Sequence, residues 1–137
     1  MKNYIELWAS NLLGRKSFQL QGTFAVVGER KAHMGARCEI AAIRATIRPA
    51  ESFQVYVDEV SNRGEIEAKG YLDAAVFGIL DVLLVGANYP LTEVAIVFHA
   101  FDVHPVESSV SAFRQAGRDA GRKILEGMRA NMFKAPV

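Results

Sequence analysis

The side chains best suited to proton transfer or metal binding in this sequence are three histidines and one cysteine, namely His33, Cys38, His99 and His104. Their spacing matches no zinc-binding pattern, because such patterns place ligands in closely spaced pairs. His99 falls inside an apolar, β-branched stretch, and Cys38 is expected to behave as a small buried apolar residue. The sequence therefore predicts no metal site.

His104 lies in the segment VHPVESS, close to the carboxylates of Asp102 and Glu107. General acid–base catalysis requires a partner that orients the imidazole within hydrogen-bond reach. Glu107 is explained equally well by favourable negative charge at the start of a following helix. We therefore expect no catalytic residue. His104 is either a contact to a partner or a loop residue whose backbone is set by Pro105.

Two groups of basic side chains are candidates for phosphate contacts, which would make RNA binding sensitive to salt. The first surrounds the polar stretch 28–37, predicted to be a loop, and comprises Arg30, Lys31, His33 and Arg37. The second is a row on the last predicted helix, where Arg114, Arg118 and Arg122 recur every four residues. For the helix row we prefer a solvated face whose charge is balanced by Asp119 and Glu126.

The segment GRKS, residues 14–17, is the nearest approach to a phosphate-binding loop. It lacks the glycine pattern of G-x-x-x-x-G-K-[ST], which lets successive backbone amides surround a phosphate. We therefore expect no binding or hydrolysis of GTP, and no cofactor.

The elements that must position these residues follow from hydrophobic periodicity. Alternation predicts strands at 17–27, 38–47, 53–60 and 91–101, with a weaker edge strand at 3–11. Helical spacing predicts helices at 65–86, ending at Gly86, and at 108–131, capped by Ser108. This order is typical of an α+β two-layer sandwich, with two helices on one face of a sheet of about four strands.

The composition is that of an ordinary globular protein, since 50% of the residues are hydrophobic and 23% are charged. A length of 137 residues suits a single domain, residues 1–137. One cysteine allows no intrachain disulfide and favours a reducing compartment. Glu6 interrupts any export signal, and Asp81 interrupts the most apolar run. We therefore expect a cytoplasmic protein that does not enter a membrane.

Five short motifs occur in a defined order along the chain. They are QGTF at 21–24, Met34–Gly35 before a strand, AKGYLDAAVFGI at 68–79, ANYPLTEVAIVF at 87–98 and VHPVESSVSAF at 103–113. Together they resemble the fourth domain of translation elongation factor G, from about Tyr4 to Gly127. The last motif keeps the family residues His104, Val106, Ser108, Ser109, Ala112 and Phe113.

The resemblance implies the fold of the second domain of ribosomal protein S-five, with a β-α-β crossover of unusual left hand. It also implies that the tip loops of this domain enter the decoding region of the ribosome. The resemblance therefore implies a non-catalytic domain that binds the ribosome or structured RNA through the residues Arg30, Lys31, His33, Arg37 and His104. The family's tip sequence GGRGQ is replaced here by VGERKA, and the family's GTPase domain has no counterpart. A small enzyme remains a third reading, by analogy of fold alone.

The helix at 65–86 carries a second apolar stripe beside its predicted core stripe. It comprises Val76, Phe77, Leu80 and Leu84, at positions where the family is mostly polar. A surface helix is not expected to be apolar all round. We therefore expect a cover, most simply a second copy of the chain packed helix on helix. The alternative covers are the N-terminus and the C-terminal segment MFKAPV. The alternative function is therefore self-association, in a protein that kept the fold but does not bind the ribosome.

Overall fold

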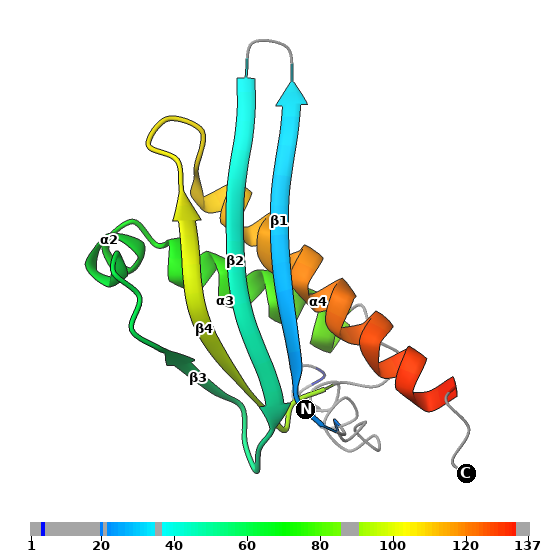
Figure 1. Cartoon of the computed structure of the whole chain (residues 1–137). Coiled ribbons are helices and arrows are strands. Elements are labelled where there is room, and N and C mark those ends of the chain that lie inside the picture. Colours follow the sequence, from blue (N-terminus) through cyan, green and yellow to red (C-terminus); the bar gives the residue numbers. More distant parts are fainter. Residues whose placement is uncertain (1–3, 5–19, 21, 35–36, 86–90, 134–137) are drawn as a thin grey trace.

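The computed structural model describes residues 4, 20, 22–34, 37–85 and 91–133. It is an α+β two-layer sandwich, as predicted (Figure 1). In chain order its elements are β1 (Phe24–Met34), β2 (Arg37–Pro49), β3 (Gln54–Val57), α2 (Arg63–Ala68), α3 (Tyr71–Leu80), a π-helical turn η1 (Asp81–Val85), β4 (Val94–Val103) and α4 (Val110–Phe133).

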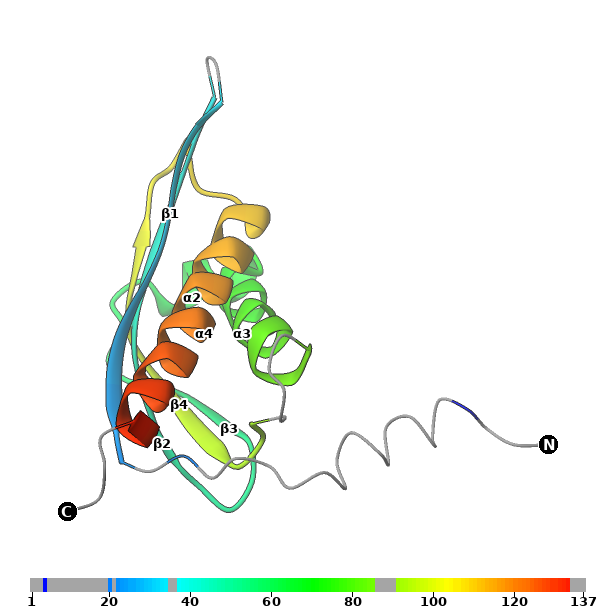
Figure 2. The same cartoon turned by 90° about the vertical axis from the view of Figure 1, so that its right-hand side faces the viewer.

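The four described strands form one mixed sheet in the order β1-β2-β4-β3. The β1–β2 and β2–β4 pairs are antiparallel, whereas β3 runs parallel to β4. The connection from β3 to β4 passes through α2 and α3, behind the sheet in Figure 1 and to its right in Figure 2. This crossover is left-handed, as the resemblance implied, against the strong right-handed preference of parallel connections.

The prediction of a loop at 28–37 is wrong over most of its length. The ladder of β1 and β2 continues from Phe24 opposite Ile47 to Met34 opposite Arg37, so the polar stretch is paired backbone. Its polarity misled the prediction because this stretch packs on a helix only at its beginning, around Gly28. The paired ends of the hairpin extend beyond the helices, where both faces of a strand can be polar (Figure 1). At its other end β1 begins only after Gly22, whose φ of 88° is outside the strand region.

The helix predicted at 65–86 is divided into α2, α3 and η1. Gly70, between α2 and α3, has a φ of 76°, a left-handed conformation that ends the first helix and redirects the chain. The proposed cap Gly86 and most of the edge strand predicted at 3–11 lie outside the described residues. No described helix is long and apolar enough to span a bilayer.

Close helix packing holds the two layers together. A Cβ on Gly78 would lie 2.1 Å from the carbonyl oxygen of Arg114, and one on Gly117 would lie 2.2 Å from that of Ala75. The backbones of α3 and α4 therefore touch directly. On its other side α4 meets β1 in the same way, since a Cβ on Gly28 would lie 2.2 Å from the carbonyl oxygen of Ala116. These contacts fix α4 against the sheet.

Candidate nucleic-acid interface

One end of the sheet gathers most of the basic residues singled out in the sequence. The paired ends of β1 and β2 extend beyond α3 and α4 there (Figure 1). The loop 104–108, between β4 and α4, lies against β2 at the same end, because the Ile40 amide donates to the Glu107 carbonyl (3.1 Å). We call these segments, residues 30–34, 37–38 and 104–108, the hairpin end.

Ser108 holds the loop at the hairpin end rather than capping α4. Its hydroxyl accepts a hydrogen bond from the His104 amide (2.8 Å) and donates one to the Ile40 carbonyl (2.7 Å). The cap of α4 is the neighbouring Ser109, whose hydroxyl accepts from the Ala112 amide (3.0 Å). The predicted capping role of Ser108 is therefore wrong by one residue, because a tertiary contact claims its hydroxyl.

The basic residues of the hairpin end do not share one face. Arg30 projects to the helix side and pairs with Glu39 at 3.1 Å. Lys31 and His33 are exposed on the opposite side, as alternation along a strand requires. Arg37 pairs through its backbone with Met34, and its side chain lies outside the described part of the structure. The hairpin end thus exposes Lys31 and His33, whereas the charge of Arg30 is compensated.

Polar contacts orient both histidines of the hairpin end. The imidazole of His104 lies between two carboxylates, with Nε2 3.5 Å from Asp102 and Nδ1 3.7 Å from Glu107. His33 Nδ1 lies 3.0 Å from the sulfur of Cys38, its cross-strand partner. Cys38 is therefore half-buried and hydrogen-bonded, not a buried apolar residue as predicted. Among the described residues no group of three or more potential metal ligands occurs.

The arginine row of α4 is bound mainly to carboxylates. Arg114 makes a two-pronged contact with Asp81 (2.9 and 3.0 Å), and Arg118 reaches the same carboxylate at 2.9 Å. The hydrogen bond from Arg114 is the main cause that holds the pKa of Asp81 below its ordinary value. Arg122 lies 3.9 Å from Asp119. This row links α4 to η1 and to its own turns.

Asp119 covers part of the open edge of β1. Its carboxylate accepts a hydrogen bond from the Glu29 amide (2.9 Å) and contacts Lys123 (3.0 Å). Partial burial raises the pKa of Asp119, but these two contacts and the charge of Arg122 together outweigh it, so the net pKa lies below the ordinary value. Lys123 also donates to the Val27 carbonyl (2.6 Å). Backbone groups that could pair with a foreign strand are thereby occupied.

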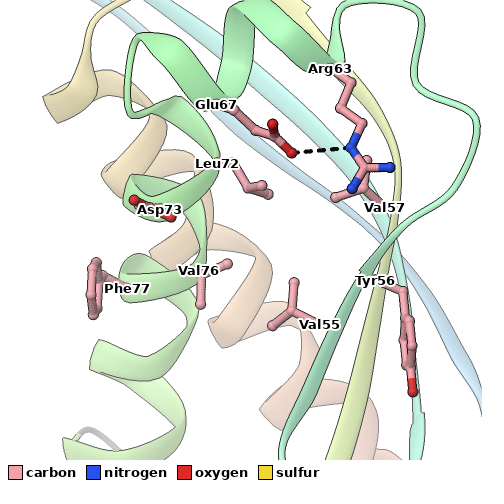
Figure 3. A pocket seen from close by; sticks show the side chains of 9 residues that line it. All are labelled: Val55, Tyr56, Val57, Arg63, Glu67, Leu72, Asp73, Val76 and Phe77. Carbon is pink, nitrogen blue, oxygen red and sulfur yellow. Dashed lines mark hydrogen bonds and ion pairs between the residues drawn. The ribbon is translucent and has the colours of Figure 1, made fainter.

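The predicted apolar stripe of the first helix is only partly exposed. Phe77 is 54% exposed, while Val76, Leu80 and Leu84 are half-buried. Val76 and Phe77 line a groove of about 560 Å³ between α3 and the edge strand β3 (Figure 3). Its remaining lining residues are Val55, Tyr56, Val57, Arg63, Glu67, Leu72 and Asp73.

Sequence reasoning missed the sheet face opposite the helices. Arg44 and Arg48 are exposed there, beside Tyr56, Thr46 and His99. The signal was present in the segment IRATIRP, where buried and exposed positions alternate. It went unused because charged residues on a half-buried strand are expected to face solvent and need no further explanation.

Comparison with known proteins supplies a fold likeness. No protein-family model matches the chain, and no curated protein matches it. A crystal structure of a protein from Thermus thermophilus is similar to it, with a TM-score of 0.67 and 20% identity. The match covers 79% of this chain but 16% of the Thermus chain. This chain therefore shares its fold with a small part of a much longer protein.

Proposed function

We propose that this chain is a non-catalytic relative of the fourth domain of elongation factor G, and that its hairpin end binds the ribosome or another structured RNA. The single observation that carries the proposal is the docking of the His104 loop on β2 through Ser108 and Ile40. This contact brings His104 to the same end of the sheet as Lys31 and His33, which are distant in the sequence.

The chemistry of this end suits phosphate contacts. Lys31 makes no ion pair with any residue that the structure describes, and it stands on a strand end that projects from the body. An uncompensated ammonium group on a projecting hairpin can reach a phosphate in a recessed RNA site. The left-handed crossover and the ordered motifs support the relationship to the elongation-factor domain.

The test is co-sedimentation of the whole chain with small ribosomal subunits over a salt series. The double variant Lys31→Glu/His104→Ala is expected to weaken binding about tenfold and to flatten the salt dependence, because each lost phosphate contact removes roughly 0.7–0.9 from the logarithmic slope. Lys69→Glu, a charge change at the exposed C-terminal cap residue of α2, is the matched control. Binding that both variants reduce equally would argue for non-specific attraction, and no saturable binding at any salt would refute the proposal.

Self-association is the second candidate function. The observation that favours it is the apolar side of α3, where Phe77 is 54% exposed next to the groove beside β3. Val85, in the following turn, is 76% exposed. Phe77 adjoins the apolar lining of the groove, and contiguous exposed apolar side chains mark interaction surfaces more often than isolated ones do.

A further inference from the structure

The sheet has one face that no described element covers. Both α3 and α4 pack on the other side, as Figure 2 shows. On the uncovered side, which we call the open face, the strand register aligns Thr46 with Val97 and Val97 with Tyr56. Arg48 and Arg44 flank Thr46 on the same strand, two positions away in either direction. Residues opposite one another in a sheet project to the same face, so these side chains form one continuous surface.

The two arginines of the open face differ from the other described arginines in their ion pairing. Five arginines whose side chains the structure describes lie within 4.0 Å of a carboxylate, namely Arg30, Arg63, Arg114, Arg118 and Arg122. Neither Arg44 nor Arg48 has such a contact with a described residue, and both are exposed. Guanidinium groups that no described carboxylate compensates are suited to bind external phosphates.

Tyr56 supplies an aromatic surface between these cations. Tyr56 is 45% exposed, and the Arg48 guanidinium lies 5.7 Å from the centroid of its ring. The hydroxyl donates to Gln54, which fixes the ring at its far end. Figure 3 shows Tyr56 projecting from β3 on the side away from Val55 and Val76, so its ring does not fill the groove. An exposed ring held next to a guanidinium plane is a stacking platform for a nucleic-acid base.

A β-bulge adds hydrogen-bonding groups to this platform. The ladder between β2 and β4 shifts at Arg44/Ala45, so His99 has no partner in the register. Its Nε2 lies 2.8 Å from the Thr46 hydroxyl, and its Nδ1 lies 3.5 Å from Asp58. Bulges redirect side chains, and this one places an imidazole on the open face beside Thr46.

The remaining residues of the open face limit where an anion can lie. Ala95 and Ala100 lie opposite Arg48 and Arg44, so the surface between the cations is shallow. The carboxylates of Glu29 and Asp102 flank Ala42, one step nearer the hairpin end. An anionic chain is therefore attracted to the part of the face around Arg44, Tyr56 and Arg48, and less to the row of Ala42.

We propose that the open face binds a short single-stranded segment of RNA, with a base stacked on Tyr56 and Arg48 and phosphates held by Arg44 and Arg48. A single strand is favoured over a duplex because stacking on a side chain requires an unpaired base. The partner class rests on the function proposed above. The surface lies on the same side of the sheet as Lys31 and His33, but beyond the row of Ala42, so its residues are not those of the hairpin end. The same RNA is then bound at two places, the hairpin end and the open face.

The test measures anisotropy of two labelled RNAs, a twelve-nucleotide oligouridine and a stable hairpin, with the whole chain. Tyr56→Ala is expected to weaken oligouridine binding about tenfold, in the range found for one lost stacked base. Tyr56→Phe retains the ring and is expected to bind as the native chain does, which separates stacking from any loss of folding. The control Phe77→Ala changes an exposed aromatic residue outside the open face and is expected to have no effect.

The outcomes distinguish this inference from the proposed function. If the hairpin RNA binds and depends on Lys31, while oligouridine binding is absent or indifferent to Tyr56→Ala, the open-face proposal is wrong and the proposed function stands. If neither RNA binds, both fail. If polyglutamate competes with oligouridine as well as unlabelled RNA does, the face attracts any polyanion and the stacking proposal is refuted.

Discussion

Asp81 is the residue at which the two long helices are joined electrostatically. Its carboxylate accepts three hydrogen bonds from Arg114 and Arg118 on α4, although each of the three side chains keeps part of its surface in water. A network around a two-pronged arginine contact is worth more than an isolated surface ion pair, which contributes about 0–1 kcal/mol. Ser108 and Ser109 are adjacent but have different roles. Ser108 bonds to β2, whereas Ser109 caps α4.

The Asp81 network predicts a pH-dependent loss of stability. Its pKa is lowered in the folded protein, so its contribution is fully present above the unfolded value of about 3.8 and is lost as pH falls below it. Asp81→Asn is expected to lower the free energy of unfolding by about 1 kcal/mol at pH 7. Urea unfolding at pH 7 and pH 3 measures this difference, which should shrink at pH 3. Asp73→Asn on α3 is the control, and an equal loss from both variants would contradict the assignment.

At the scale of elements, the contact between α3 and α4 depends on the absence of side chains. Gly78 and Gly117 let the two backbones meet, and Ala75 is fully buried beside them. Gly117 is buried as well, whereas Val110, at the start of α4, is 52% exposed.

Gly117→Ala is therefore expected to destabilise the protein, although alanine favours helices. The new Cβ would lie 2.2 Å from the Ala75 carbonyl oxygen, so the helices must separate, at a cost of about 1–3 kcal/mol. Gly127→Ala on the same helix is the matched control, since its Cβ would meet the Phe24 ring at 3.4 Å. There the gain in helix propensity, about 1 kcal/mol, should prevail. Thermal unfolding of both variants checks this, and a Gly117→Ala variant as stable as Gly127→Ala would disprove the close-packing argument.

At the scale of the whole molecule, three surfaces can be distinguished, two of them on the sheet and one on the helix layer. The hairpin end carries Lys31, His33 and His104. The open face carries Arg44, Arg48 and Tyr56. The apolar side of α3 lies in the other layer and adjoins the groove beside β3. The proposed RNA contacts and the proposed self-association therefore fall on different surfaces, and one does not exclude the other.

Self-association through α3 is tested by Phe77→Ser. If a second copy covers this side, the variant is expected to shift the protein toward monomer at equal concentration, because a specific interface loses most of its energy with a central aromatic residue. Leu80→Glu should have a larger effect, since Leu80 is half-buried beside it. Sedimentation velocity over a concentration series measures the shift. Val106→Ser, at a 90% exposed loop position, is the control. A native chain that is monomeric at all concentrations would refute self-association through α3.

The two-layer α+β class and the approximate positions of its strands and helices were predictable from the sequence alone. These features depend on local hydrophobic periodicity, which the chain shows clearly for β2, β4 and α4. The extension of β1 through a polar stretch was not predictable, because it depends on pairing with a strand whose register is set elsewhere. The division of the first predicted helix was not predictable either, because it depends on the left-handed conformation of Gly70.

The candidate sites were also predictable from the sequence only in part. The sequence identified Lys31, His33 and His104 by residue type and by resemblance. Their placement at one end of the sheet was decided by the bonds that Ile40 of β2 makes with Ser108 and Glu107. Arg30 and Arg44 look alike in the sequence. Only the tertiary structure shows that one is paired with Glu39 and the other is not, because ion pairing depends on which side chains folding brings within reach.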